Sequence, residues 1–221
     1  MYFAVLYSCF GFIYFLTQYT QYSARKQAEL SMTAKEAELS LLKSQINPHF
    51  LFNSLNSIYT LIYQKNEKAL ASVEKLSSIL RYALYEQREK VSIETELNCL
   101  KDFIQLQQLR IDETAAISID LDNVDNNLQI SPHLLIGFAE NAFKHGDFSD
   151  PATPLKISAS THEKTLTFEV VNKKSILHKP PAGGIGLQNV KRRLDLLYEN
   201  RYKLNIEDNE KTFSVNLTID L

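Results

Sequence analysis

A helical apolar period dominates the N-terminal half of the chain and constrains its fold more than any other feature. Before Pro48 this period alternates spacings of four and three residues, which marks the a/d seam of a coiled coil. The seam consists of Leu30, Ala34, Ala37 and Leu41. A seam this narrow needs a partner helix, so the segment predicts a stalk that pairs in parallel with a second copy of itself.

After Pro48 the period resumes as two amphipathic segments separated by a polar stretch at residues 64–67. The apolar positions are Leu51, Leu55, Ile58 and Ile62 in the first segment, and Leu70, Val73, Leu76, Ile79, Leu80 and Leu84 in the second. Two helices joined by a short polar turn predict an antiparallel hairpin, and two hairpins make a four-helix bundle. Residues 94–109 predict a third helix that connects the hairpin to the C-terminal half of the chain.

Pro48 is the exception in this pattern, and His49 follows it directly in the segment 45–53, which reads QINPHFLFN. Proline in a helix interior removes a backbone donor and clashes with the preceding turn, at a cost of about 3 kcal/mol. A sequence that accepts this cost beside an imidazole could be using the kink to expose the ring. An ordinary histidine at a helix break is the alternative, and the segment alone leaves both open.

The first 24 residues differ in kind because they contain no charged side chain. The run from Tyr2 to Leu16 is almost wholly apolar or aromatic, and Arg25 and Lys26 follow soon after it. Crossing a bilayer takes about 20 predominantly apolar residues, and positive charge marks the cytoplasmic side. We predict a membrane helix over residues 1–23, which could be the last of several, with a buried core helix as the alternative.

Charge and cysteine content exclude two broad classes of function. The chain has 24 Lys and Arg against 26 Asp and Glu, a formal net charge of −2, so we expect no direct nucleic-acid partner. Its two cysteines, Cys9 and Cys99, lie far apart and have no further metal ligands at useful spacing. We therefore expect no disulfide framework, and we expect the protein to work in a reducing compartment.

Beyond Ile111 the pattern is mixed and predicts an α+β sandwich. We expect strands at residues 117–121, 155–160, 166–171, 202–206 and 213–219. Helices are expected at residues 132–144 and from residue 183 to Leu197, with a polar loop at residues 173–182.

Two short clusters in this part could hold a phosphate-bearing ligand. Residues 183–187 read GGIGL where a loop leads into a helix, and glycines with a helix N-terminus favour phosphate binding. Residues 140–146 read ENAFKHG, where Asn141 could offer an oxygen to Mg²⁺ and Lys144 a charge to phosphates. Each cluster alone also fits an ordinary loop or a charged helix end capped by Gly146.

Together, three motifs resemble the LytS-like sensor histidine kinases in order and spacing. They are the segments 45–53, 140–146 and 184–190, the last reading GIGLQNV. The resemblance covers nearly all of the chain after Arg25. It implies an N-terminal membrane helix and a dimerising hairpin, followed by the Bergerat ATP-binding sandwich of the GHKL superfamily.

The resemblance also implies the roles of individual residues, with ATP and Mg²⁺ as cofactors. His49 would accept the γ-phosphoryl group, Asn141 would chelate Mg²⁺, and residues 173–182 would form the ATP lid. The nucleotide site would consist of Glu140, Asn141, Lys144, His145, Asn172, Gly184, Gly186, Leu187, Asn189 and Arg193. The remaining histidines, His133, His162 and His178, are expected to be solvated or capping side chains.

The chain departs from the family pattern at the adenine site. GHKL proteins usually hold adenine through an aspartate in a strand-end motif of the Asp-x-Gly-x-Gly type. Residues 170–174 read VVNKK here, with neither that aspartate nor those glycines. Asn172 could still hydrogen-bond the adenine edge, because an amide carries both a donor and an acceptor.

The other departures concern proton removal and water. Many histidine kinases place an acidic residue directly after the phosphoacceptor as a general base, and Phe50 occupies that position here. Asn53 lies four residues after His49, on the same helical face, and could orient the ring or a hydrolytic water. Water-splitting members of the superfamily carry a glutamate four residues before the magnesium asparagine, a position that is Gly137 here.

The sequence therefore predicts a homodimeric sensor histidine kinase anchored in the bacterial cytoplasmic membrane, with its catalytic part in the cytoplasm. Its domains would be a membrane helix at 1–23, a stalk and phosphoacceptor hairpin at 24–92, and an ATP-binding domain with its linker helix at 93–221. The phosphoryl group would pass to a response regulator, one of LytTR type. The alternatives are a non-catalytic membrane scaffold with a degenerate ATP site and a phosphatase-dominant form.

Overall fold

The computed structural model describes residues 15–22, 24–27, 48–86, 88–111, 114–175 and 185–221. It separates into two units, residues 1–47 and residues 48–221. In the first unit, residues 15–22 and 24–27 are helical, and the predicted coiled-coil seam lies outside the described residues together with most of the predicted membrane helix. Within the described ranges, no helix has both the length and the hydropathy that crossing a bilayer requires.

The second unit begins with the predicted helical hairpin, α2 (Pro48–Tyr63) and α3 (Lys68–Tyr85). The connecting turn contains Lys65 in the left-handed region at φ 52°, and Asn66 Oδ1 accepts a hydrogen bond from the backbone N–H of Lys68 at 2.9 Å. An asparagine that caps the following backbone is a common way to end a turn and start a helix. The polar stretch at 64–67 thus acts as the sequence predicted.

Helix α4 (Ile93–Gln108) lies under the hairpin and is the most deeply buried helix described. Its N-cap is Ser92, whose Oγ accepts from the backbone N–H of Thr95 at 3.2 Å. The hairpin packs on α4 through Leu76, Ile79 and Ala83 of α3, and the ring of Phe50 lies 4.9 Å from that of Phe103. The inner face of the hairpin therefore belongs to the same apolar core as the rest of the unit.

Six of the described strands form one mixed sheet in the order β2–β5–β6–β8–β7, with β4 paired to β6. Strands β2 and β5 are parallel, and the other pairs are antiparallel. The bounds are β2 (Ile117–Asn123), β4 (Gly146–Asp147), β5 (Leu155–His162), β6 (Thr165–Lys174), β7 (Tyr202–Asp208) and β8 (Thr212–Asp220). Two short strands, β1 (Val91–Ser92) and β3 (Gln129–Ile130), form a separate antiparallel pair beside α4.

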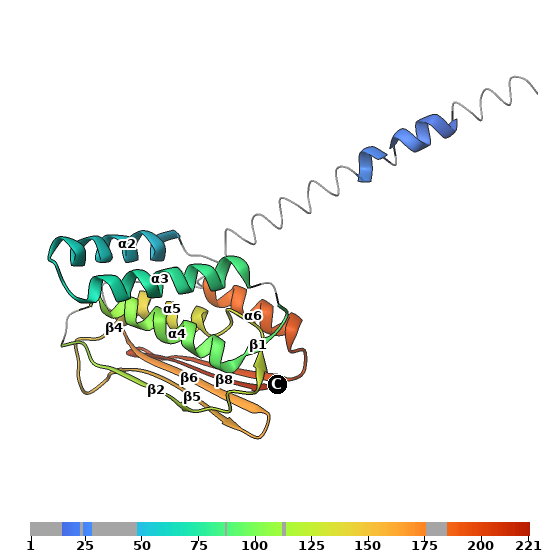
Figure 1. Cartoon of the computed structure of the whole chain (residues 1–221). Helices are drawn as coiled ribbons and strands as arrows, with labels where there is room; N and C mark the ends of the chain where they lie inside the picture. Colours follow the sequence, from blue (N-terminus) through green and yellow to red (C-terminus); the bar gives the residue numbers. More distant parts are fainter. Residues whose placement is uncertain (1–14, 23, 28–47, 87, 112–113, 176–184) are drawn as a thin grey trace, which may run out of the picture. The chain divides into compact units, whose positions relative to one another are not determined.

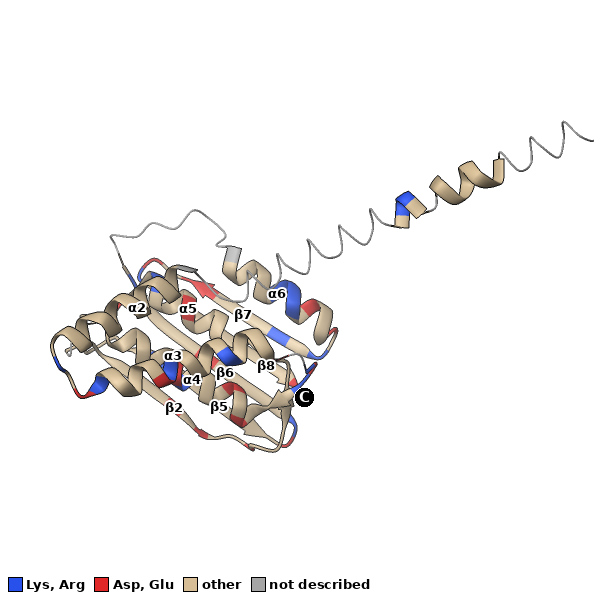
Figure 2. Ribbon diagram, turned by 45° about the horizontal axis from the view of Figure 1, so that its top comes forward, with Lys and Arg blue, Asp and Glu red and all other residues tan. Residues whose placement is uncertain are grey.

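Helices α4, α5 (Ile136–His145) and α6 (Ile185–Leu197) cover one face of this sheet (Figures 1 and 2). Alternation explains the contact, because Leu166, Phe168, Val170 and Asn172 of β6 are buried. Phe168 meets Phe138 of α5 at a ring distance of 6.1 Å. Above these helices the hairpin forms a third layer (Figure 1).

Two boundaries differ from the sequence prediction. Strand β6 continues to Lys174, two residues into the segment predicted as the ATP lid, because Lys173 and Lys174 pair with β4 and Lys173 also pairs with β8. The rest of that segment, residues 176–182, lies outside the described residues. Helix α5 begins at Ile136 rather than at Pro132, since His133 takes the left-handed φ of 58°.

Candidate functional site

His49 lies in the first turn of α2, and its side chain is exposed to solvent. Asn53 Nδ2 lies 3.1 Å from both Nδ1 and Nε2 of this ring, so the side chains predicted to share a helical face are in contact. The amide can donate to whichever ring nitrogen carries no proton. Phe50 occupies the position where many histidine kinases carry an acidic residue. It is 6% exposed because its ring packs on Phe103.

The ENAFKHG segment forms the C-terminal part of α5 and the start of β4. Asn141 and Glu140 are half-buried, and Lys144 is exposed. The backbone of this segment is joined to the end of β6, because Gly146 pairs with Lys174 and His145 O accepts from Ser175 N–H at 2.9 Å. The helix that carries Asn141 thus ends beside the strand that carries Asn172.

Asn172 has an acceptor that the described chain does not satisfy. The residue is 1% exposed, its Nδ2 donates to the carbonyl of Lys173 at 3.0 Å, and its Oδ1 is buried with no hydrogen-bond partner among the described residues. Leaving a buried acceptor unpaired costs about 1–3 kcal/mol. A donor that reached this oxygen would satisfy it, and the role of Asn172 toward adenine stays a prediction.

The cation next to Asn172 is engaged within the protein. Lys173 Nζ lies 3.3 Å from Asp150 and 3.4 Å from Asp147, and its hydrogen bond to Asp150 leads the contacts that raise its pKa above the ordinary lysine value. This ammonium therefore stabilises the β4–β6 corner. Lys144 is exposed on α5, and its role toward a phosphate group stays a prediction.

Helix α6 supplies the glycine-motif residues that the structure describes. A Cβ atom built at Gly186 would meet no atom of the described residues within 4 Å, so among these residues the space beside this first turn is open. Leu187 is half-buried and Asn189 exposed, whereas Gly184 lies outside the described residues. Open space at a helix N-terminus is what close approach of a phosphate requires.

Arg193, predicted to line the nucleotide site, binds backbone instead in the described structure. Its guanidinium donates to the carbonyl oxygens of Pro132 at 2.6 Å and His133 at 3.0 Å. It ties α6 to the segment that leads into α5. A direct role of Arg193 toward a nucleotide remains a prediction.

The sequence did not identify a buried polar cluster around Glu96 of α4. Glu96 is 0% exposed, its Oε2 accepts from Tyr82 Oη at 2.5 Å, and it accepts from the backbone N–H groups of His133 and Leu135 at 2.9 Å each. Burial raises the pKa of the Glu96 carboxyl, and the hydrogen bond from Tyr82 opposes that rise. A signal existed, because Glu96 falls on the apolar face of α4 between Ile93 and Leu100.

His133 is a correction to the expectation of a solvated or capping side chain. Its ring lies 4.4 Å from the ring of Tyr82, and its Nε2 is buried with no hydrogen-bond partner among the described residues. Burial, with the positive charge of Arg193, lowers the pKa of His133 to about 4. His162 is exposed at the β5–β6 turn as expected, and His178 lies outside the described residues.

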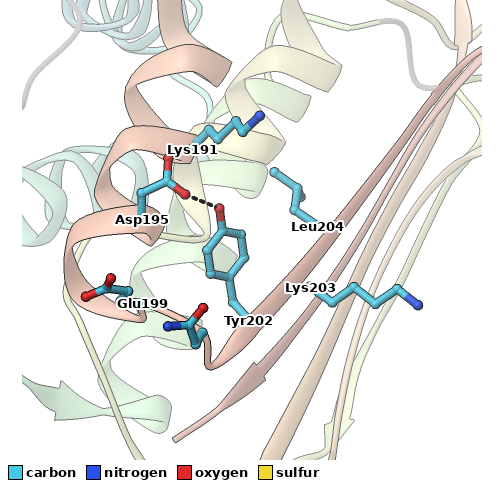
Figure 3. Close-up of a pocket in the computed structure, with 7 residues that line it drawn as sticks. Lys191, Asp195, Glu199, Tyr202, Lys203 and Leu204 are labelled. Carbon is cyan, nitrogen blue, oxygen red and sulfur yellow. Dashed lines mark hydrogen bonds between the residues drawn. The ribbon is translucent and has the colours of Figure 1, made fainter.

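A pocket of about 570 Å³ between α6 and β7 lies apart from these residues (Figure 3). It is lined by Lys191, Asp195, Glu199, Asn200, Tyr202, Lys203 and Leu204. Tyr202 Oη donates to Asp195 at 2.5 Å across it. Since no residue of the three motifs lines this pocket, it is not the predicted nucleotide site.

The donors for a metal are few. Within the described residues, no three His, Cys, Asp or Glu side chains cluster as metal ligands would. Mg²⁺ commonly binds through one or two protein oxygens together with substrate phosphates. Asn141 fits such a shared site and would not hold the ion alone.

Comparisons with known proteins agree with the motifs. A sequence model of the family described as histidine kinase matches residues 37–115. Sensor protein LytS of Staphylococcus saprophyticus is 31% identical over 209 residues, covering 87% of this chain and 35% of that protein. Sensor histidine kinase YesM of Bacillus subtilis is 29% identical over 203 residues, covering 88% of this chain and 35% of that protein.

Among solved structures, the Acinetobacter baumannii histidine kinase AdeS covers 85% of this chain and 96% of its own, with 13% identity and a TM-score of 0.42. That likeness is too low to support a conclusion. The proteins that this chain matches, and whose motifs it carries, are sensor histidine kinases. The chain belongs to the LytS-like family of these proteins, and it spans about a third of the length of the curated relatives it matches.

Proposed function

We propose that this chain is the kinase part of a two-component sensor, which phosphorylates itself on His49 and passes the group to an aspartate of a response regulator. The observation that supports this most is the exposed His49–Asn53 pair at the start of α2. It occurs on the same chain as Asn172, a buried acceptor without a partner among the described residues and suited to adenine. A nucleophile and a nucleotide site are the two parts that the reaction needs.

In the transfer, a ring nitrogen of His49 attacks the γ-phosphorus of ATP. A nitrogen–phosphorus bond forms, the bond from phosphorus to the bridging oxygen breaks, and ADP leaves with that electron pair. The attacking nitrogen needs its lone pair, so its hydrogen bond from Asn53 Nδ2 must break before attack. Asn53 thus orients the ring at rest, and the second ring nitrogen releases its proton to solvent.

The nucleotide-binding residues act by positioning and by charge. Asn172 Oδ1 would accept from the adenine amino group, Lys144 would neutralise phosphate charge, and Asn141 would offer an oxygen to Mg²⁺, which would supply further charge neutralisation. The open first turn of α6 at Gly186 gives the phosphates access to backbone amides. Holding both reactants in place accounts for much of the rate in such reactions.

A second copy of this chain is the proposed partner of the hairpin. Phe52, Leu55, Tyr59 and Ile62 follow one outer face of α2 at spacings of three and four residues, with exposures from 48% to 70%. This is the spacing of a helix-pairing seam. The four-helix bundle predicted from the sequence would bury it.

The remaining proposals concern the setting. By similarity to LytS-like relatives, residues 1–23 would anchor the chain in the cytoplasmic membrane with the kinase part in the cytoplasm. The regulator would be of LytTR type. The stalk would carry the signal from the membrane to the hairpin.

A second candidate is a scaffold or phosphatase that binds nucleotide without charging His49. Two observations favour it: Phe50 replaces the usual acid and is committed to packing, and Asn172 replaces the usual adenine-binding aspartate. In the phosphatase form, Asn53 would position a water for hydrolysis at the regulator.

The test is to incubate the full-length chain in detergent with γ-labelled ATP and Mg²⁺. We expect acid-labile label on the wild type and none on His49→Ala or Asn141→Ala. His162→Ala, which alters an exposed histidine of the β5–β6 turn, is the matched control and should label normally. Nucleotide binding without label would select the second candidate, and label that survives His49→Ala would show that another residue accepts the group.

A further inference from the structure

The Glu96 carboxylate connects three elements that the proposed reaction needs. From the hairpin, Tyr82 Oη of α3 donates to Oε2 at 2.5 Å. From the segment before α5, the backbone N–H of His133 donates to Oε2 and that of Leu135 to Oε1, at 2.9 Å each. One side chain of α4 therefore contacts both α3, the second helix of the hairpin, and the segment that leads into α5, the helix of Asn141.

The contacts on the α5 side form a helix cap. Leu135 is the residue directly before α5, and its N–H is one of the amides that a helix cannot satisfy internally. Its own side chain provides no cap, so Glu96 supplies the acceptor from another helix. Through this cap, Glu96 fixes where α5 starts.

Helix α6 is joined to the same segment from the other side. Arg193 donates to the carbonyls of Pro132 and His133, while Glu96 accepts from the N–H of His133. The segment between β3 and α5 is thus hydrogen-bonded to Glu96 of α4 and to Arg193 of α6. A displacement of this segment would move α5 and α6, the two helices proposed to bind the nucleotide.

The Tyr82–Glu96 bond is the buried polar contact between the hairpin and α4. Both groups are desolvated, and a hydrogen bond to a buried carboxyl group is among the stronger kinds. At a more exposed part of the same interface, Asp102 of α4 contacts Lys75 of α3 at 3.8 Å and hydrogen-bonds Ser78. The remaining α3–α4 contact consists mainly of apolar side chains such as Leu76, Ile79 and Ala83. Of the two polar contacts, the Tyr82–Glu96 bond is the one that continues to the segment before α5.

We propose that Glu96 is a positioning residue for phosphoryl transfer, which sets the register of the hairpin, and hence of His49, against the nucleotide-binding helices through Tyr82. The proposal rests on the proposed kinase function. It also implies the reverse effect: nucleotide bound at α5 and α6 changes the protection of α3, because linkage between two sites is reciprocal.

The simpler view is that the cluster only stabilises the fold. The two views differ in what removal of one hydroxyl does. Tyr82→Phe keeps the ring that packs on His133. It also keeps the hydrogen bonds from the backbone N–H groups of His133 and Leu135 to Glu96, so we expect the nucleotide site to stay intact. A structural role predicts lower stability with unchanged transfer by the folded protein. A positioning role predicts slower transfer with unchanged nucleotide affinity.

The experiment compares wild type, Tyr82→Phe and Tyr85→Phe as full-length chains in detergent. Tyr85 is the matched control, on the same helix but 75% exposed. We measure the rate of His49 labelling at saturating ATP, the Kd for the non-hydrolysable analogue AMPPNP, and hydrogen exchange of α3 amides with and without AMPPNP. Circular dichroism shows that each variant is folded.

For Tyr82→Phe we expect at least about a tenfold lower labelling rate, since small misplacements of reacting groups carry such losses. Its Kd for AMPPNP should stay within about twofold of wild type, and the nucleotide-dependent change in α3 exchange should disappear. Tyr85→Phe should match wild type in all three. In Glu96→Gln, which also weakens the α5 cap, we expect both the affinity and the rate to fall.

Wild-type labelling rates in a folded Tyr82→Phe chain would overturn the positioning role, and so would an α3 exchange response that survives the mutation. A wild type that binds AMPPNP without labelling would instead contradict the proposed kinase function. The hydrogen exchange of α3 with and without AMPPNP would then show by itself whether the Tyr82–Glu96 bond couples the hairpin to the nucleotide site. A wild type that binds no nucleotide would contradict both proposals.

Discussion

The helical hairpin leaves many large apolar side chains in solvent, whereas the sheet and the helices on it bury most of theirs. Tyr59 of α2 is 70% exposed and Leu70 of α3 is 71% exposed, while Phe168 of β6 and Leu217 of β8 are 0% exposed. Both regions share one continuous core on the inner side of the hairpin. The difference therefore lies mainly in the outer face of the hairpin, which gathers most of the exposed large apolar side chains described in this unit; Leu196 of α6, at 74% exposed, lies outside it.

This difference indicates that the two regions reach stability in different ways. The sandwich buries its apolar strand positions within one chain, beneath α4, α5 and α6. The hairpin packs on α4 on one side and keeps an exposed apolar face on the other, which is the face proposed to pair with a second copy. Mutations in the sandwich should change the unfolding free energy, and mutations on the outer hairpin face should change association.

The largest expected effect is in the sandwich core. Phe168→Ala removes a ring that lies 6.1 Å from Phe138, and such truncations cost about 3–5 kcal/mol. The hairpin counterpart Tyr59→Ala should change the unfolding free energy of the dilute chain by less than about 0.5 kcal/mol. Urea unfolding at low protein concentration measures both. Equal losses in the two variants would contradict this division between the regions.

The second prediction concerns how the free energy of unfolding changes with pH because His133 is buried in the sandwich. His133 has a pKa of about 4 when folded, against about 6.5 when unfolded, so only the unfolded chain takes up this proton as the pH falls from 6.5 to 4. Stability should therefore fall through that window, by up to about 3 kcal/mol from this group.

His133→Asn is the variant that isolates this contribution, because asparagine tolerates the left-handed φ at this position. The raised pKa of Glu96 acts with the opposite sign, so the readout is the difference between wild type and variant at each pH. That difference should change between pH 6.5 and 4 and stay constant above pH 7.5. Parallel stability curves across the acid window would contradict the buried, neutral state of His133.

The third prediction concerns the outer hairpin face. Leu55→Glu places a charge in the proposed seam, and burying it unpaired should weaken self-association by about a hundredfold, or about 2.7 kcal/mol. Sedimentation velocity measures the change. Ser118→Glu, at an exposed position of β2 in the sandwich, is the matched control and should associate like wild type. An unchanged Leu55→Glu dimer would place the partner surface elsewhere.

The smallest expected effect compares two capping side chains, Ser92 in the sandwich and Asn66 in the hairpin. Ser92→Ala removes the N-cap of the buried α4 and should cost about 1 kcal/mol of unfolding free energy. Asn66→Ala removes the cap at the exposed hairpin turn and should cost about half as much, because water replaces an exposed bond more easily. Thermal unfolding of the two variants side by side would show the order, and a larger loss in Asn66→Ala would reverse it.

Local patterns predicted most of the elements. The period of the hairpin, the alternation along β5, β6 and β8, and the glycine-led start of α6 each have a cause within a few residues. The faces were harder to assign, since α2 is apolar on both sides. Ile58 points into the core and Leu55 into solvent, although both belong to the same predicted period.

Tertiary contacts explain what the sequence did not reveal. Strands β1, β3 and β4 have two residues each, too few for a period, and exist because longer elements bring them together. The burial of Glu96 depends on donors 14 and 39 residues away, Tyr82 and Leu135. For the site, the contact of His49 with Asn53 followed from helix geometry, whereas the unpaired Oδ1 of Asn172 depends on how β6 packs.

Gly137 makes a close contact between two helices possible. A Cβ atom at this position would lie 2.5 Å from Cγ2 of Val190, a buried, branched side chain of α6. By the resemblance drawn from the motifs, position 137 is where water-splitting GHKL proteins carry their glutamate. A glutamate there would require Val190 or the backbone of α6 to shift, since so short a separation is not tolerated. The close packing of α5 on α6 therefore disfavours that glutamate in this chain.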